Sequence, residues 1–158
     1  MIPEHLGPTR GPQTFFITSS TDQKKSVFQV EQWARIFLKN LYKHKKEKAY
    51  LLHCFVLMPD HFHLLITPVP DTTLEKSLQF IKGGSAYELK QAGRTGSAVW
   101  QRGYTDHRVR DGKEYEEIVI YIHQNPVKAG LVQKAEDYKY SSAYPGWKLD
   151  PPRSYLSG

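Results

Sequence analysis

His61 and His63, which are separated by one residue, are the residues whose types and spacing best suit a chemical role in this sequence. They lie in the run MPDHFHLLIT over 58–67, which is typical of a β-strand that follows a Pro-Asp turn. Residues i and i+2 of a strand leave the same face, so both imidazoles share one face and Phe62, Leu64 and Ile66 share the other. Two neutral imidazoles held side by side are a ready pair of metal ligands. With seven histidines in 158 residues, a chance His-x-His occurs about 0.3 times per chain, so one buried and one solvated histidine remains the alternative.

A second group of residues that could take part in a reaction lies on the helix that the sequence predicts from about Gly112 to Gln124. Asp111 is expected to cap this helix, and Pro126 and Gly130 are expected to stop it. A core stripe follows the i, i+3, i+4, i+7 spacing of Tyr115, Ile118, Val119 and Ile122.

At about 100° per residue, Tyr121 and Asn125 lie together on one flank of that stripe, and His123 lies on the opposite flank. A phenol and an amide could therefore approach His61 and His63 if the helix packs on the sheet. The alternative is that Tyr121 simply borders the core.

The elements that must position these groups follow from periodicity. The sequence predicts strands over 14–18, 49–58, 61–67 and 99–109, and helices over 30–42, 73–91 and 112–124, with Gly83-Gly84 interrupting the second helix. The order strand, helix, strand, strand, helix, strand, helix is that of an α+β, ferredoxin-like antiparallel sheet. We expect helices packed on one face of this sheet, plus a C-terminal helix that carries Tyr121.

Length and composition predict one domain over 1–158, with an irregular arm over 1–12 and an irregular tail over 145–158. The net charge of +6 and the aromatic content of 13% suit a polyanionic partner such as single-stranded nucleic acid. Cys54, the single cysteine, excludes an intramolecular disulfide and a cysteine-based zinc site, and it reads as a small core residue. No membrane span or signal peptide is recognisable, so we expect a cytoplasmic protein with no membrane partner.

Three blocks of sequence carry a family resemblance: MPDHFHLL over 58–65, WQ and YTDHRVRD within 100–111, and YIHQNPVKAGL over 121–131. Together with the segment 138–144, they resemble the REP-associated tyrosine transposases, relatives of the single-tyrosine HUH transposases of small bacterial insertion sequences (the IS200-like group). The resemblance spans most of the chain. It implies a ferredoxin-like nuclease fold, a divalent metal (Mg or Mn) on His61 and His63, Tyr121 as nucleophile, and Asn125 as a further polar ligand or metal-site residue. Broader relatives often have Gln at the position of Asn125, and Asn has a shorter reach.

The resemblance further implies a metal-dependent endonuclease and strand transferase that cleaves single-stranded DNA at repeat hairpins through a covalent 5′-phosphotyrosine. Such a protein would work as a monomer or homodimer in the bacterial cytoplasm, at the nucleoid. The candidate phosphate contacts are the basic residues Lys82, Arg102, Arg108 and Arg110, the last two on one strand face. The candidate stacking platforms are Trp100, Tyr104 and Trp147.

Two other classes of function fit parts of the sequence. A ferredoxin-like sheet can be a non-catalytic platform for single-stranded nucleic acid, although such modules carry aromatic residues where this chain carries His61 and His63. A small-nucleotide phosphodiesterase of the two-histidine type would need two His-x-Thr/Ser motifs, and the sequence contains none.

Overall fold

Four antiparallel strands form one sheet in the part of the chain that the structure describes. The computed structural model describes residues 13–156, so the irregular arm expected over 1–12 lies outside the described residues. The strands are β1 (Phe15–Ser20), β2 (Tyr50–Met58), β3 (His61–Pro68) and β4 (Thr105–Arg108), in the spatial order β2-β3-β1-β4. With the helices between them they follow the β-α-β-β-α-β order of ferredoxin-like folds, which confirms the predicted α+β class.

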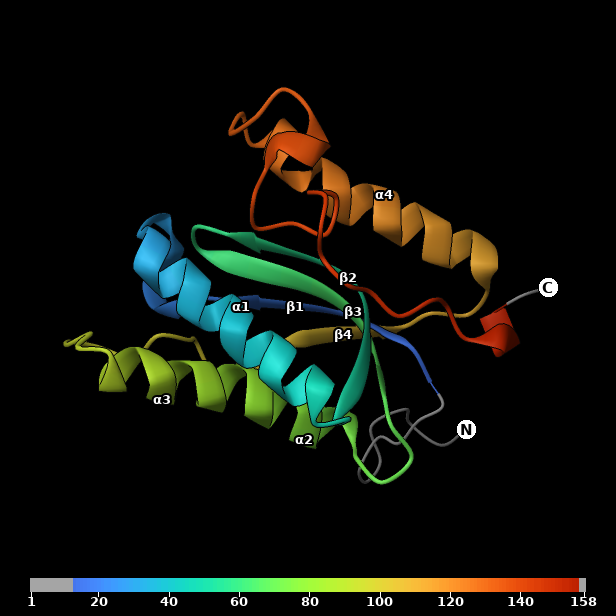
Figure 1. The fold of residues 1–158 in the computed structure, drawn as a ribbon, viewed down its shortest axis with the longest axis horizontal. Helices are drawn as coiled ribbons and strands as arrows, with labels where there is room; N and C mark the ends of the chain where they lie inside the picture. The colour runs from blue at the N-terminus through green and yellow to red at the C-terminus, as the bar shows by residue number, and fades with distance from the viewer. Residues whose placement is uncertain (1–12, 157–158) are drawn as a thin grey trace.

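Helices cover both faces of the sheet (Figure 1). Helices α1 (Glu31–Lys46), α2 (Leu74–Leu78) and α3 (Gly84–Gln91) cover one face, and α4 (Gly112–Lys128) covers the other. The larger core lies under the first three helices and takes the β3 residues Phe62, Leu64 and Ile66. The smaller core lies under α4 and contains Cys54, Val56 and Leu65. Burial on both faces explains why β2 reads as a continuous apolar run.

The helix expected over 73–91 is continuous through its pair of glycines. A π-helical turn, Gln79–Gly83, joins α2 to α3. The buried side chain of Asn40 on α1 lies against this turn, where its Nδ2 donates to the carbonyl of Phe80 at 3.0 Å. The glycines therefore mark a widened turn, in which the Phe80 carbonyl accepts from the Gly84 N–H and also from Asn40.

The predicted length of the strand over 99–109 is wrong, because β4 has only four residues. Before β4, Val99 is buried in the core and Trp100 forms an isolated bridge with Thr21. After β4, the Arg110 guanidinium lies 3.2 Å from Oε2 of Glu114 on the following helix. Arg108 and Arg110 therefore do not share a strand face.

Helix α4 begins as predicted but ends later. The side chain of Asp111 accepts from the Glu114 N–H at 2.9 Å, which is the expected cap. The helix then continues through Pro126 to Lys128, so the expected stop at Pro126 is wrong. A buried proline removes one backbone hydrogen bond, and packing keeps the helix intact there. After Lys128 the chain turns out of the helix at Gly130 (φ 75°), the other predicted stop, and the Leu131 N–H donates to the Pro126 carbonyl at 2.9 Å.

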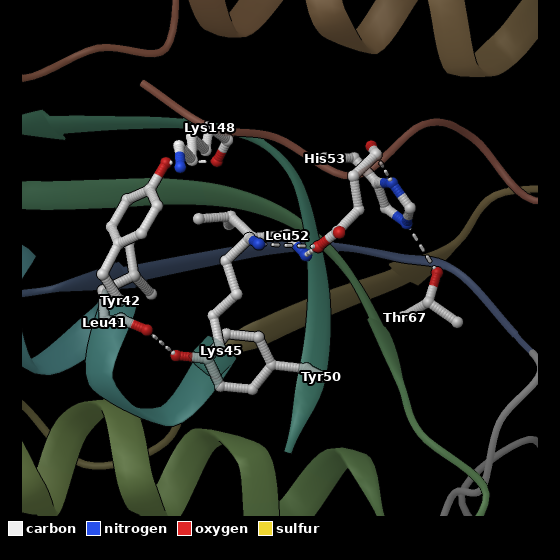
Figure 2. A network of polar contacts seen from close by, with 9 residues as sticks. Leu41, Tyr42, Lys45, Tyr50, Leu52, His53, Thr67 and Lys148 are labelled. Carbon is white, nitrogen blue, oxygen red and sulfur yellow. Dashed lines mark hydrogen bonds and ion pairs between the residues drawn. The ribbon is translucent and has the colours of Figure 1, made fainter. Parts of the chain in front are cut away.

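The C-terminal segment covers the outer edge of β2. Leu57 N–H donates to the Tyr140 carbonyl at 2.8 Å, and Leu52 N–H donates to the Asp150 carboxylate at 2.9 Å. Figure 2 shows this edge further along, where the Tyr42 hydroxyl donates to the Lys148 carbonyl and His53 meets Thr67. The tail is thus irregular in conformation, as expected, yet closely packed. No helix within residues 13–156 is long and apolar enough to cross a membrane.

Candidate active site

The two imidazoles of β3 lie side by side on the face covered by α4. Their ring centroids are 4.9 Å apart, and the rings meet edge to face. His63 is 4% exposed, whereas the side chain of His61 is 24% exposed at the end of the strand. The alternation predicted for this strand is confirmed, because Phe62 and Leu64 enter the core on the opposite face.

A hydrogen bond orients each ring. Nδ1 of His63 lies 2.8 Å from Thr18 Oγ1, on the β1 residue that pairs with it in register. Nδ1 of His61 lies 2.7 Å from Oδ1 of Asp60. Because Nδ1 of each ring has a partner, Nε2 of each ring remains for a ligand.

Burial, together with the neighbouring charge of His61, lowers the pKa of His63 to about 4. At neutral pH the His63 imidazole is therefore uncharged, and the uncharged ring is the form that binds a metal ion.

The Tyr121 ring lies directly beside His63. The two ring centroids are 5.5 Å apart, and Phe16 of β1 contacts both rings, with centroids 5.9 Å from Tyr121 and 5.5 Å from His63. Tyr121 is 45% exposed, so this side chain is partly open to solvent. Lys128 Nζ lies 5.9 Å from the centre of the same ring. A single chain thus brings together the histidines and a tyrosine that follows them by about sixty residues.

The other two polar residues of α4 lie as the helical geometry requires. Asn125 is half-buried one turn beyond Tyr121, and its ligation of a metal stays a prediction. His123 lies on the opposite flank, where its Nε2 is 2.8 Å from Ser142 Oγ and 3.3 Å from Cys54 Sγ.

The donor set at this site suits a divalent metal that also binds the substrate. Within residues 13–156 there is no cluster of three or more His, Cys, Asp or Glu side chains able to enclose an ion. His61 and His63 would supply two nitrogen ligands, and Asn125 on α4 is the predicted third ligand. The remaining positions would be left to water and phosphate oxygens, which are the ligands that Mg and Mn favour.

Three of the predicted DNA contacts lie around the loop before β4 and help to hold that loop. Lys82 Nζ donates to the carbonyls of Gln101, at 3.0 Å, and Gly103, and it lies 5.9 Å from the Tyr104 ring. Burial lowers the pKa of Lys82 and, with nearby carboxylates, raises the pKa of Tyr104 to about 12. Trp100 packs against Phe28, Phe37 and Phe62 and donates to Ser85, so the structure places its ring in the core.

The other three predicted phosphate contacts are arginines. Arg102 is exposed in the loop, Arg108 ends β4, and Arg110 pairs with Glu114 at the start of α4. Trp147, the other predicted platform, stacks on Tyr42 with ring centroids 5.4 Å apart.

Sequence reasoning missed the partners of the two imidazoles. Asp60 directly precedes His61, so adjacency alone could have indicated it. Thr18 and Phe16 lie on β1, more than forty residues away, and only the register between β1 and β3 brings them to the site.

Comparison with known proteins finds similarity to transposases, in agreement with the family resemblance seen in the sequence. A sequence model of the family described as "Transposase IS200 like" matches residues 14–125. The REP-associated tyrosine transposase of Escherichia coli (strain K12) is 26% identical over 132 residues, which cover 82% of this chain and 75% of the relative. A putative REP-associated tyrosine transposase of Haemophilus influenzae is 32% identical over 96 residues, 54% of each chain.

Among solved structures, a REP-associated tyrosine transposase bound to a REP hairpin superposes with a TM-score of 0.73 at 24% identity, covering 99% of this chain and 97% of that one. A putative transposase from Deinococcus radiodurans gives a TM-score of 0.55 at 21% identity, covering 78% and 97%. At these identities the two structures establish the shared fold. The matched family segment includes His61, His63 and Tyr121, and the chain belongs to the IS200-like transposase family.

Proposed function

We propose that this protein is a metal-dependent endonuclease and strand transferase that cleaves single-stranded DNA beside hairpins of the repetitive extragenic palindrome type. The observation that carries the proposal is the position of the Tyr121 ring, exposed and 5.5 Å from His63 in the same chain. The names of the relatives, and the hairpin bound to one of them, support the choice of DNA.

The residues of the site divide the reaction between them. His61 and His63 would hold the divalent metal, Mg or Mn, and a metal bound there would neutralise charge on the scissile phosphate. Thr18 and Asp60 occupy Nδ1 of the two rings, which leaves Nε2 of each ring for the metal. Lys128, above the Tyr121 ring, adds positive charge where the phosphate approaches.

Tyr121 supplies the nucleophile. Its phenol oxygen forms a bond to phosphorus, the bond from phosphorus to the 3′ oxygen breaks, and the phenol proton leaves to solvent as the 3′-hydroxyl is protonated. The DNA 5′ end is then held as a phosphotyrosine. Attack by another 3′-hydroxyl reverses these steps and joins strands.

The direct test is the Tyr121→Phe variant with an end-labelled hairpin carrying unpaired flanks, in Mg or Mn. We expect the wild type to form a covalent protein–DNA adduct on a denaturing gel and the variant to form none. Tyr87→Phe, an exposed tyrosine on α3, is the matched control and should behave as wild type. Adduct formation by Tyr121→Phe would contradict the assignment, and tight, salt-sensitive binding without any cleavage would support a non-catalytic binding module.

The geometry also supports cleavage by one copy of the chain. We expect a mixture of His61→Ala and Tyr121→Phe proteins to remain inactive, because each copy lacks one half of its own site. Adduct formation by the mixture would instead show a site shared between two copies.

A further inference from the structure

A groove beside α1, at the β2 edge of the sheet, lies outside the site described above. It encloses about 380 Å³ between α1 and the C-terminal segment. Its aromatic wall is formed by Tyr140, Tyr144 and Trp147, and its rim carries the cations Arg35, Lys39 and Lys139. Flat apolar surfaces bordered by positive charge match the two parts of a nucleotide, the base and the phosphate.

One ring of the aromatic wall, Trp147, is held in place by contacts within the protein. Trp147 stacks on Tyr42, meets Phe55 edge to face with centroids 5.3 Å apart, and donates from Nε1 to the Lys139 carbonyl at 3.1 Å. Tyr144 is 39% exposed, so one ring of the wall is open to solvent. A base that stacks on the open Tyr144 ring would thus lie against a wall in which Trp147 is already ordered, which limits the conformational freedom lost on binding.

The rim is positively charged even though it includes a carboxylate. Oε1 of Glu31 lies 3.2 Å from Lys139 Nζ and 3.1 Å from the Arg35 guanidinium, and these two partners lower its pKa. Three cations against one carboxylate leave a net charge of +2 on the rim (3 − 1). That excess favours a phosphate backbone over an acidic or neutral apolar ligand.

The C-terminal segment connects this groove with the catalytic face. Tyr138 packs against the core under α4, and its hydroxyl donates to the Leu57 carbonyl at 2.7 Å. Tyr140, two residues on, packs against the core under α1. Leu57 pairs with Phe62, next to His61, so the segment crosses the sheet edge at the strand end that holds the histidines.

The geometry points to a second DNA subsite: this groove binds an unpaired stretch of the substrate strand, with a base stacked on Tyr144 and phosphates on Lys39, Arg35 and Lys139. The inference rests on the proposed function, because it takes the same single-stranded DNA as ligand.

The test compares a hairpin that carries an unpaired extension of about ten thymidines with the same hairpin lacking it. Affinity is measured by fluorescence anisotropy in the Tyr121→Phe background, which keeps binding reversible. We expect Tyr144→Ala to weaken binding of the extended hairpin about 5- to 20-fold, the loss of one base stack. Lys39→Glu should lower the salt slope by about 0.7 or more, as expected for one lost phosphate contact.

Neither variant should change the affinity for the hairpin without the extension. Tyr87→Ala and Lys90→Glu, exposed positions on α3, are the matched controls and should leave both affinities unchanged. A 5-bromodeoxyuridine in the extension should cross-link under ultraviolet light to the peptide containing Tyr144.

Wild-type affinity for the extended hairpin in both groove variants would overturn the inference and leave the groove to another occupant, such as a protein partner. Equal weakening of both hairpins would also overturn it. The adduct assay separates the two proposals: normal adduct formation with no effect of groove variants rejects only the groove. Groove-dependent binding without any adduct rejects only the catalytic assignment.

Discussion

Each imidazole of the candidate site has an oxygen partner at Nδ1, and this detail decides what the site can bind. With Nδ1–H donating to Thr18 or Asp60, the lone pair of each ring lies on Nε2. Such partners typically alter metal affinity by about 10- to 100-fold. The pairing of His61 and His63 was predictable from strand alternation. Thr18 was not, because its position depends on strand register across 45 residues.

At this scale we predict the effect of Thr18→Val. The substitution keeps the shape of the side chain but removes the oxygen at His63 Nδ1, so Mn binding measured by calorimetry should weaken about 10-fold. Thr18→Ser retains the hydroxyl and should bind Mn as the wild type does. Equal affinities for the valine and serine variants would show that the hydrogen bond does not orient the ligand.

Among the elements, α4 is the one whose rotation about its own axis matters most. Its two flanks lie against different parts of the molecule, since Tyr121 meets His63 while His123 meets Ser142 and Cys54. Residues two apart on a helix differ by about 200° in direction, so holding one flank sets the direction of the other. The contacts of His123 therefore help to fix the direction of Tyr121, the proposed nucleophile.

We accordingly predict that His123→Ala slows adduct formation by about 10-fold while hairpin affinity and Mn affinity stay at wild-type values. The helix loses its link to the C-terminal segment, and Tyr121 spends less time in line with the phosphate. His123→Gln, which can still bond to Ser142, should recover part of the rate. A normal rate for His123→Ala in the adduct assay would remove His123 from this role.

The joint between α2 and α3 offers a second prediction for an element, because it contains two adjacent glycines of helical conformation. A Cβ on Gly83 would meet nothing within 4 Å, whereas a Cβ on Gly84 would lie 2.9 Å from Oδ1 of the buried Asn40. Gly83→Ala should raise the free energy of unfolding by about 0.5–1 kcal/mol through helix propensity. Gly84→Ala should lower it by about 1–3 kcal/mol, because Asn40 must leave its bond to the turn. Urea denaturation measures both, and shifts of the same sign would contradict this packing.

For the whole molecule, the order of elements was predictable because each element has its own periodicity. The errors arose where tertiary packing overrides local pattern: Val99 and Trp100 are apolar because they enter the core, and Pro126 is tolerated inside a packed helix. The path of the C-terminal tail along β2 has no local signal. The residues of the candidate site could be identified from the sequence, but the β1 side chains that contact the His63 ring could not.

The buried histidines give the whole molecule a predictable response to acid. His53 donates from Nδ1 to the Asp150 carbonyl at 2.9 Å and lies 2.8 Å from Thr67 Oγ1 (Figure 2). Burial lowers the pKa of His53, as it does for His63 and His123. In the unfolded chain these histidines take up protons near pH 6.5, whereas the folded chain resists protonation.

The free energy of unfolding should therefore fall as the pH drops from about 7 to about 5, by up to about 1.4 kcal/mol per pH unit for each such histidine. Urea titrations across this range measure the slope. His53→Asn retains a donor for Asp150 but cannot take up a proton in this range. It should reduce the slope of unfolding free energy against pH by up to the contribution of one histidine. A stability that does not change over this range would show that the histidines titrate alike in both states.

The covered edge of β2 limits how the sheet can be extended. Its outward backbone groups bond to Tyr140, Ser142 and Asp150 of the same chain, so another strand cannot add there without displacing the C-terminal segment. The opposite edge, β4, is a four-residue strand with two charged side chains, too short to template a long ladder. The two edges of the sheet are in this way protected from edge-to-edge aggregation.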